Sequence, residues 1–285
     1  MSSITAHCLV KNEENFVGYA IKSVINYVDS IIVFDTGSTD KTVEIIQNLA
    51  KEYPNKIIFE EKGIADGKRH TELRQEMLAR TKTDWFMILD GDEIWTERGI
   101  KEALGIIRKN NPTIECIDAP FYICVGDIYH RTIKKGQMER KAYKDFFYPR
   151  FLKITNGVHW IGDYNQDTLK TGDGQYFCQD GNATILQSKY WHVTHLKRSS
   201  RDDNDYSSGG NRRAKRRLTY FIIGDKINEI PPEVFEGKTA EFRMSWPTSF
   251  INFFNILIHK LCQSFYKIYF VVRMIYRNFN GERVR

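Results

Sequence analysis

The chain of 285 residues carries a net charge of +6, and 41% of its residues are hydrophobic and 13% aromatic. This composition excludes a disordered chain and provides enough apolar surface for one large globular domain or two small ones. The five cysteines include no CxxC pair, which argues against a zinc site and against a disulfide framework, so a reducing cytoplasm is the expected compartment. The N-terminal residues lack the successive regions of a signal peptide, and none is expected.

The first 110 residues alternate between runs typical of strands and runs typical of helices. Short apolar runs predict strands over residues 4–10, 30–34, 56–60 and 85–89. Apolar residues at helical spacing predict helices over residues 15–27, 43–49, 71–80 and 100–107. This alternation predicts an α/β fold with a mainly parallel central sheet flanked by helices.

After Pro112 the pattern changes to longer strand-like runs separated by polar loops. The runs 115–125, 146–154 and 181–196 predict a mixed-sheet extension of the first half. The stretch 198–213 is rich in Ser, Asp, Gly and Arg, which predicts a loop that could order over a ligand.

Three acidic segments, residues 10–15, 35–42 and 90–93, follow predicted strands. Ligands of open parallel sheets bind beyond the carboxyl ends of the strands, so these segments predict one acidic cleft. Asp90 and Asp92 are separated only by Gly91, so both carboxylates can reach one ligand, and such a pair needs a cation. The alternative is a solvated turn that leads into the next helix.

The common phosphate-binding loops are missing from this sequence. No GxGxxG follows the first strand, and GxxxxGK[ST] does not occur. A divalent metal at Asp92 could instead neutralise a diphosphate that the acids alone would repel, while other acids accept hydrogen bonds from a base or a ribose. The pattern therefore predicts a site for a nucleotide diphosphate.

The three segments resemble motifs of the family 2 glycosyltransferases, which have the Rossmann-like GT-A fold. "LVKNEEN" from Leu9, "DTGSTDKT" from Asp35 and "DGDE" from Asp90 match the first-strand motif, the second-strand motif and the DxD metal motif in order and spacing. The resemblance covers residues 4–110 and extends less firmly to about residue 200. It implies an enzyme of the hexosyltransferase type that uses a nucleotide-diphosphate sugar, with UDP-sugars favoured, and Mg²⁺ or Mn²⁺.

The resemblance also implies roles for individual residues. Asp35 would contact the nucleobase, Asp90 the ribose side of the donor and Asp92 the metal on the diphosphate. Arg74 would lie near the donor phosphates, although it could equally be a solvated helix residue. His195 would complete the metal site, with a histidine satisfied within its strand as the alternative. The implied nucleotide-sugar site comprises Val10, Asn12, Glu13, Asp35, Gly37, Arg74, Asp90 and Gly91.

An inverting transferase needs a carboxylate that accepts the proton of the acceptor hydroxyl. Relatives often carry a His-Glu pair at the position where this chain reads "DYNQD". Asp163 is the favoured base, with Asp167 behind it, and the alternative for each is a loop-capping residue. Trp95 and Trp160 could stack on a sugar ring or could belong to the core.

The C-terminal stretch from Phe242 to Gly281 contains no acidic residue. On a helix its aromatic and aliphatic residues share one face and its basic residues lie opposite, which predicts an amphipathic helix on an anionic membrane surface. The alternative is a helix packed on the catalytic domain or in a homodimer interface. The expected organisation is a GT-A domain over 1–241, with a nucleotide-binding half (1–110) and an acceptor half (111–241), followed by a membrane-associating segment (242–285).

The sequence thus predicts a metal-dependent, inverting glycosyltransferase on the inner face of the membrane. Its acceptor would be a glycan or lipid-linked hydroxyl in cell-surface polysaccharide or glycoconjugate synthesis, and no nucleic-acid partner is expected. One rival is a sugar-phosphate nucleotidyltransferase, which would be expected to open with a Gly-rich basic loop. The other is a non-catalytic, membrane-bound glycan-binding protein, against which the complete set of acids argues.

Overall fold

The computed structural model describes residues 2–132, 139–140, 143–144, 147–163, 167–179, 181–200 and 225–242. The predicted amphipathic helix and most of the predicted loop over 198–213 lie outside the described residues. The helices are α1 (Val17–Val24), α2 (Thr42–Glu52), α3 (Gly67–Arg80), α4 (Glu97–Arg108), η1 (Glu233–Phe235) and η2 (Thr239–Phe242). The strands of the first half are β1 (Ile4–Val10), β2 (Ser30–Asp35), β3 (Ile57–Glu61), β4 (Trp85–Ile88) and β5 (Glu93–Ile94). Those of the second half are β6 (Cys116–Val125), β7 (His130–Arg131), β8 (Glu139–Arg140), β9 (Tyr143–Lys144), β10 (Phe147–Lys153), β11 (His159–Ile161), β12 (Thr168–Lys170), β13 (Ala183–Ile185), β14 (Tyr190–His195) and β15 (Asp225–Lys226).

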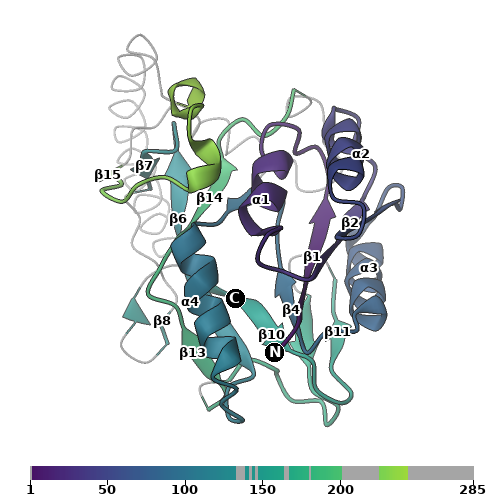
Figure 1. Cartoon of the computed structure of the whole chain (residues 1–285). Helices are drawn as coiled ribbons and strands as arrows, with labels where there is room; N and C mark the ends of the chain where they lie inside the picture. The colour runs from purple at the N-terminus through teal and green to yellow at the C-terminus, as the bar shows by residue number, and fades with distance from the viewer. Residues whose placement is uncertain are drawn as a thin grey trace, which may run out of the picture.

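A large central sheet organises the molecule (Figure 1). Strands β3, β2, β1 and β4 are parallel neighbours in that order, and antiparallel β10 joins them to β6. The register pairs Val10 with Asp35, so the first two acidic segments leave the sheet side by side. The mainly parallel α/β fold of GT-A type is confirmed.

Helices cover both faces of the parallel strands (Figure 1). In β2, Ile31 and Val33 pack in the core with α1 and α2, whereas Ile32 and Phe34 face the other side. There Phe34 packs in a cluster with Leu73 of α3. A strand buried on both faces reads as a continuous apolar run, which explains why "SIIVF" lacks alternation.

Strand β6 is the centre of the second half. It pairs antiparallel with β10 and parallel with β13 and β14, so this half extends the sheet with mixed strands. The run 181–196, predicted as one strand, is divided into β13 and β14. Helix α3 begins at Gly67, four residues earlier than predicted, because the Asp66 carboxylate accepts the N–H of Arg69 at 2.8 Å and caps the helix.

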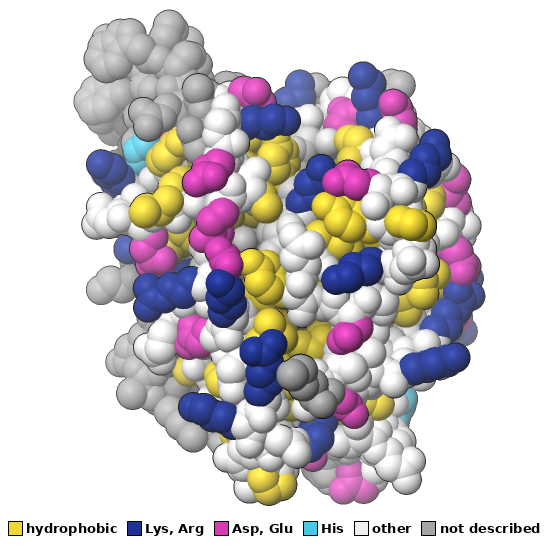
Figure 2. All heavy atoms as spheres, viewed as in Figure 1, with side chains coloured by type: hydrophobic (Ala, Val, Ile, Leu, Met, Phe, Trp, Pro, Cys, Tyr) yellow, Lys and Arg dark blue, Asp and Glu magenta, His cyan; other side chains and the backbone are white. Residues whose placement is uncertain are grey.

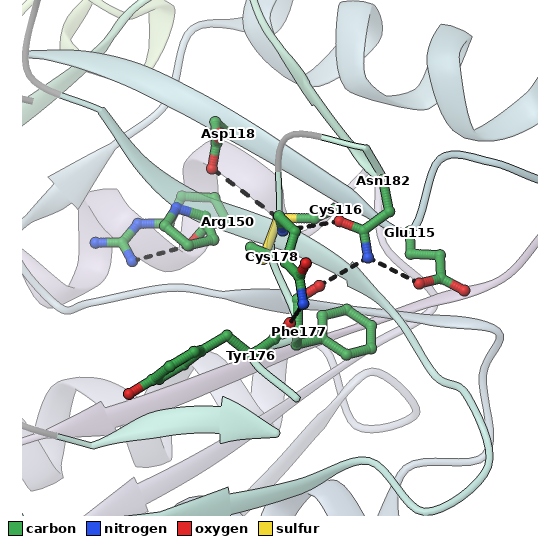
Figure 3. Close-up of a disulfide and its surroundings, with 10 residues drawn as sticks. Glu115, Cys116, Asp118, Arg150, Tyr176, Phe177, Cys178 and Asn182 are labelled. Carbon is green, nitrogen blue, oxygen red and sulfur yellow. Dashed lines mark hydrogen bonds between the residues drawn. A yellow bond between two sulfur atoms is a disulfide. The ribbon is translucent and has the colours of Figure 1, made fainter. Parts of the chain in front are cut away.

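The cysteine spacing argued against disulfide bonds, and that expectation was wrong. Cys116 of β6 and Cys178 form a disulfide, while Cys8 and Cys124 are free and buried. Figure 3 shows the disulfide beside Asn182, whose side-chain amide donates to the carbonyl of Phe177 at 2.7 Å and to Glu115 at 2.9 Å. The two cysteines are 62 residues apart, and only the folding of the second half brings their segments together.

The surface of the described region mixes charges of both signs. On the face in Figure 2, acidic and basic side chains alternate and hydrophobic side chains lie between them. Among the helices that the structure describes, none has the length and apolar character needed to cross a bilayer.

Candidate active site

A cavity of about 940 Å³ opens where β1, β2 and β4 end. Residues from both halves of the chain line it, including Lys11, Thr36, Arg150 and Arg198. Seven of the predicted site residues belong to its lining: Val10, Glu13, Arg74, Asp90, Gly91, Asp92 and Asp167. The other five do not: Asn12, Asp35, Gly37, Asp163 and His195.

Asp35, at the end of β2, holds the loop that follows it. One carboxylate oxygen accepts the N–H groups of Gly37 and Ser38 at 2.9 Å each, and the Ser38 hydroxyl donates to the other. Gly37 has a φ of +86°, which favours glycine at this turn. The Asn12 side chain accepts the N–H of Thr39 at 2.8 Å and ties the loop to the end of β1. These residues therefore fix the conformation of the loop that follows β2, and Asp35 is only 2% exposed.

Gly91 allows the turn between the two predicted donor carboxylates to pack against β1. A Cβ atom at this position would lie 3.0 Å from side-chain carbons of both Val10 and Glu13. Real Cβ atoms rarely approach other atoms so closely, so a larger residue would require the Val10 and Glu13 side chains to move. The close packing of this turn therefore favours glycine between Asp90 and Asp92.

Asp92 lies among cationic side chains. Its Oδ1 is 3.4 Å from Nε2 of His192, and its Oδ2 accepts Nη1 of Arg198 at 3.1 Å. Burial alone would lower the pKa of His192, but the Asp92 carboxylate raises it above the usual value. The same Arg198 nitrogen also donates to Glu13.

The structure places His192 beside Asp92, whereas the predicted His195 does not belong to the cavity lining. Side chains alternate along a strand, and in β14 His192 and Thr194 line the cavity while His195 does not. The N–H of Val193 bonds to the carbonyl of Asp92 at 2.9 Å, which aligns β14 with the turn. The sequence showed both histidines, but not which face of the strand would meet the cavity.

Asp92 and His192 could hold a divalent metal. In the part of the chain that the structure describes, no group of three or more His, Cys, Asp or Glu residues has metal-binding geometry. Mg²⁺ commonly takes only one or two carboxylates from a protein and completes its shell with substrate phosphates and water. An oxygen and an imidazole nitrogen from the protein therefore fit Mg²⁺ or Mn²⁺ on a diphosphate.

Asp90 lies between two arginines. Its Oδ1 is 3.7 Å from Nη2 of Arg74, and its Oδ2 is 3.3 Å from Nη2 of Arg150. The sequence interpretation missed Arg150, which is 57 residues from Glu93 but forms a buried ion pair with it. The Tyr190 hydroxyl also donates to Glu93, at 2.9 Å. Burial raises the pKa of Glu93 to about 7, and Arg150 partly offsets that effect.

Of the two candidate bases, Asp167 lies at the cavity and Asp163 is exposed outside it. Oδ2 of Asp167 forms an ion pair with Nε of Arg74 at 2.9 Å. The Arg74 guanidinium also lies 5.2 Å above the ring of Trp160, which lines the cavity. His70 lines the same wall, and burial together with Arg74 lowers its pKa to about 4.

The other tryptophan considered as a sugar platform belongs to the core. Trp95 is 1% exposed, stacks on Tyr190 at 4.7 Å and meets the ring of Phe151 edge-on at 5.4 Å. Trp160 and Tyr176 both line the cavity, and Tyr176 is 61% exposed.

Comparisons with known proteins bear on the family to which the chain belongs. The model of glycosyl transferase family 2 matches residues 8–194. Two uncharacterized glycosyltransferases match shorter stretches: one from Rickettsia felis is 34% identical over 93 residues (33% of this chain and 30% of the relative), and one from Rickettsia bellii is 36% identical over 92 residues (32% and 28%). The match thus spans less than a third of the length of either relative.

Two solved structures are similar to parts of this chain. S. aureus TarS, residues 1–349, is 11% identical with a TM-score of 0.47 and covers 76% of this chain and 69% of its own. Glucosyl-3-phosphoglycerate synthase from Mycobacterium tuberculosis, in complex with Mn²⁺, UDP and glucosyl-3-phosphoglycerate, is 22% identical with a TM-score of 0.33 and covers 42% and 44%. The family match over residues 8–194 carries the assignment: the chain belongs to glycosyl transferase family 2.

Proposed function

We propose that this glycosyltransferase moves a sugar from a nucleotide-diphosphate donor, with a UDP-sugar favoured, to a hydroxyl of a glycan or lipid-linked acceptor. The observation that carries the proposal is that Asp92, His192 and Asp167 all line one cavity, with His192 beside Asp92. The pair Asp92 and His192 suits a metal-bound diphosphate, and Asp167 offers a carboxylate to the acceptor.

Asp167 replaces Asp163 as the proposed base. The Asp167 carboxylate would accept the proton of the acceptor hydroxyl while the acceptor oxygen forms a bond to the anomeric carbon. The bond from that carbon to the diphosphate oxygen breaks, and its electron pair leaves with the nucleoside diphosphate. Attack from the face opposite the leaving group inverts the anomeric centre.

Cationic residues would assist departure of the diphosphate. A bound Mg²⁺ or Mn²⁺ at Asp92 and His192 would supply Lewis acidity toward the diphosphate oxygens. Arg74 links the two sides of the reaction, because its guanidinium contacts both Asp90 and Asp167. We assign it the orientation of these carboxylates, beyond the phosphate contact that the resemblance implies.

The first test is a thermal-shift screen of UDP-, GDP-, CDP- and dTDP-sugars with and without Mn²⁺. A ligand that prefers the native state raises the melting temperature, so one donor should do so strongly only when metal is present. Turnover of that donor should then distinguish a transferase from a non-catalytic glycan-binding relative. A shift of equal size without metal would contradict the metal-dependent reading.

The proposed site of action is the inner face of the membrane. The support comes from the sequence, in which Phe242–Gly281 combines an aromatic face with five lysines and arginines, Arg243, Lys260, Lys267, Arg273 and Arg277, and no acid. Each basic residue near an anionic surface contributes about 1 kcal/mol. Co-sedimentation with anionic liposomes should be lost on truncation after Arg243. Equal recovery of the full and the truncated chain with the liposomes would show that this segment packs on the catalytic domain or in a dimer interface instead.

A further inference from the structure

The Arg198 side chain occupies the acidic corner of the cavity. Its Nη1 atom donates to Oε1 of Glu13 and lies 3.1 Å from Oδ2 of Asp92. Only 7% of the side chain of each acid is exposed, and 12% of the arginine. A guanidinium that bridges two buried carboxylates neutralises charge where a metal would otherwise be attracted.

Hydrogen bonds hold the backbone around Arg198 against the loops that follow β1 and β2. The N–H of Asn15 donates to the Arg198 carbonyl at 3.0 Å, and the Asn15 side chain donates to the Lys197 carbonyl at 2.9 Å. The Ser199 hydroxyl donates to Asp40, next to the helix that follows the Asp35 loop. These contacts fix the backbone at Arg198. The fold therefore sets the position from which the Arg198 side chain reaches the two acids.

A divalent cation would compete with this guanidinium for the same carboxylate. Asp92 already meets His192 at its other oxygen, and a further cation at this corner would be repelled by the positive charge of Arg198. A diphosphate changes that balance, because a guanidinium pairs strongly with phosphate oxygens. Arg198 lines the cavity, so a diphosphate bound there would lie near its guanidinium.

We propose that Arg198 is an internal counter-ion that keeps the affinity for divalent metal low until the donor diphosphate draws its guanidinium away from Asp92. This proposal rests on the proposed metal-dependent use of a nucleotide-diphosphate donor. Its consequence is coupling: metal raises the affinity for nucleoside diphosphate, and the nucleoside diphosphate raises the affinity for metal by the same factor. Metal alone is held weakly, so donor and metal enter together.

The test measures binding of Mn²⁺ alone, of UDP alone and of both, by calorimetry and by the electron paramagnetic resonance of free Mn²⁺. Wild type, Arg198→Gln and Arg198→Lys are compared with Lys197→Gln, which removes the same charge from the exposed neighbour. Because an opposite charge at this distance shifts cation binding to a carboxylate by about one to three powers of ten, Arg198→Gln should bind Mn²⁺ alone at least about tenfold more tightly. Its affinity for UDP with Mn²⁺ should fall, while Lys197→Gln should match wild type.

The outcomes separate this proposal from the proposed function. If wild type binds none of UDP, GDP, CDP and dTDP even with Mn²⁺, the proposed function fails. If wild type binds one of them with Mn²⁺ but Arg198→Gln leaves the affinity for Mn²⁺ alone unchanged or weaker, the counter-ion role is overturned. Arg198→Lys keeps the charge and should retain most of the coupling, which supports the role even if Arg198→Gln unfolds; a lysine variant that binds Mn²⁺ alone tightly would contradict it.

Discussion

The Arg74 guanidinium connects Asp167 with Asp90 across the cavity: Nε lies 2.9 Å from Oδ2 of Asp167, and Nη2 lies 3.7 Å from Oδ1 of Asp90. These carboxylates come from opposite halves of the chain, and the arginine comes from α3, which packs against β11. One side chain therefore contacts both the proposed donor side and the proposed acceptor side. The assignment of the base to Asp167 itself rests on its place in the cavity lining, where Asp163 is not found.

Replacing Asp167 by Asn should abolish transfer while leaving donor binding in place. Asparagine keeps the size of the side chain but cannot accept the proton, so the transfer rate should fall on the order of 10²-fold or more. Calorimetry with the donor and a transfer assay measure the two effects. Asp163→Asn is the matched control, since Asp163 is exposed and outside the cavity; loss of transfer in that variant, with Asp167→Asn active, would return the role to Asp163.

His192 and His195 should respond differently to the same substitution. His192→Gln removes the imidazole next to Asp92, so the affinity for Mn²⁺ in the presence of nucleoside diphosphate should fall by about 10- to 100-fold. His195→Gln changes a side chain that does not belong to the cavity lining and should leave that affinity unchanged. The measurement is a Mn²⁺ titration at saturating nucleotide. The opposite pattern would restore the metal role that the family resemblance implies for His195.

Removing Arg150 should destabilise the fold. Glu93 is fully buried, and Arg150→Met would leave its carboxylate without the guanidinium, at a cost of about 3–5 kcal/mol in the free energy of unfolding. Urea unfolding measures this cost. Tyr190→Phe deletes one hydrogen bond to the same carboxylate and should cost only about 1 kcal/mol. Equal losses in the two variants would show that the ion pair adds nothing beyond a neutral contact.

Buried His7 should make the protein sensitive to acid. Burial, and then Arg74, lower the pKa of His7 from 6.5 to about 3. Between pH 6.5 and pH 3, the unfolded chain therefore binds a proton at this residue and the native protein does not. The free energy of unfolding therefore falls on acidification, by about 1.4 kcal/mol per pH unit from this residue. His7→Gln should remove that share between pH 6 and pH 4.5. Parallel pH profiles for wild type and variant would contradict the assignment.

The sequence allowed the strands and helices of residues 1–110 to be predicted well. The apolar runs that became β1, β2 and β4 end in acids, and parallel pairing must bring such ends together, as the register of Val10 with Asp35 confirms. The actual partners of these acids could not be predicted, because they come from distant segments. Arg198 lies 185 residues from Glu13, and no local pattern connects the two.

Strand orientation limited the rest of the prediction. The sequence shows both His192 and His195 in one run, but the pairing of β14 with β5 and β6, whose register is irregular between the two histidines, decides which of them meets the cavity. Asp163 and Asp167 lie between β11 and β12, and the sequence likewise does not show which of the two lines the cavity. The disulfide between Cys116 and Cys178 also depends on how the second half folds back on β6.

Asp92 carries the central claim that the donor binds through a metal held at this residue. The most direct measurement is the affinity for UDP, or for whichever nucleoside diphosphate the screen selects, in wild type and Asp92→Asn with and without Mn²⁺. Asparagine keeps the size of the side chain and removes the charge that attracts the cation. The account predicts that Mn²⁺ strengthens nucleotide binding in wild type by at least about tenfold and has little effect in Asp92→Asn. Equal strengthening by Mn²⁺ in both proteins would contradict it.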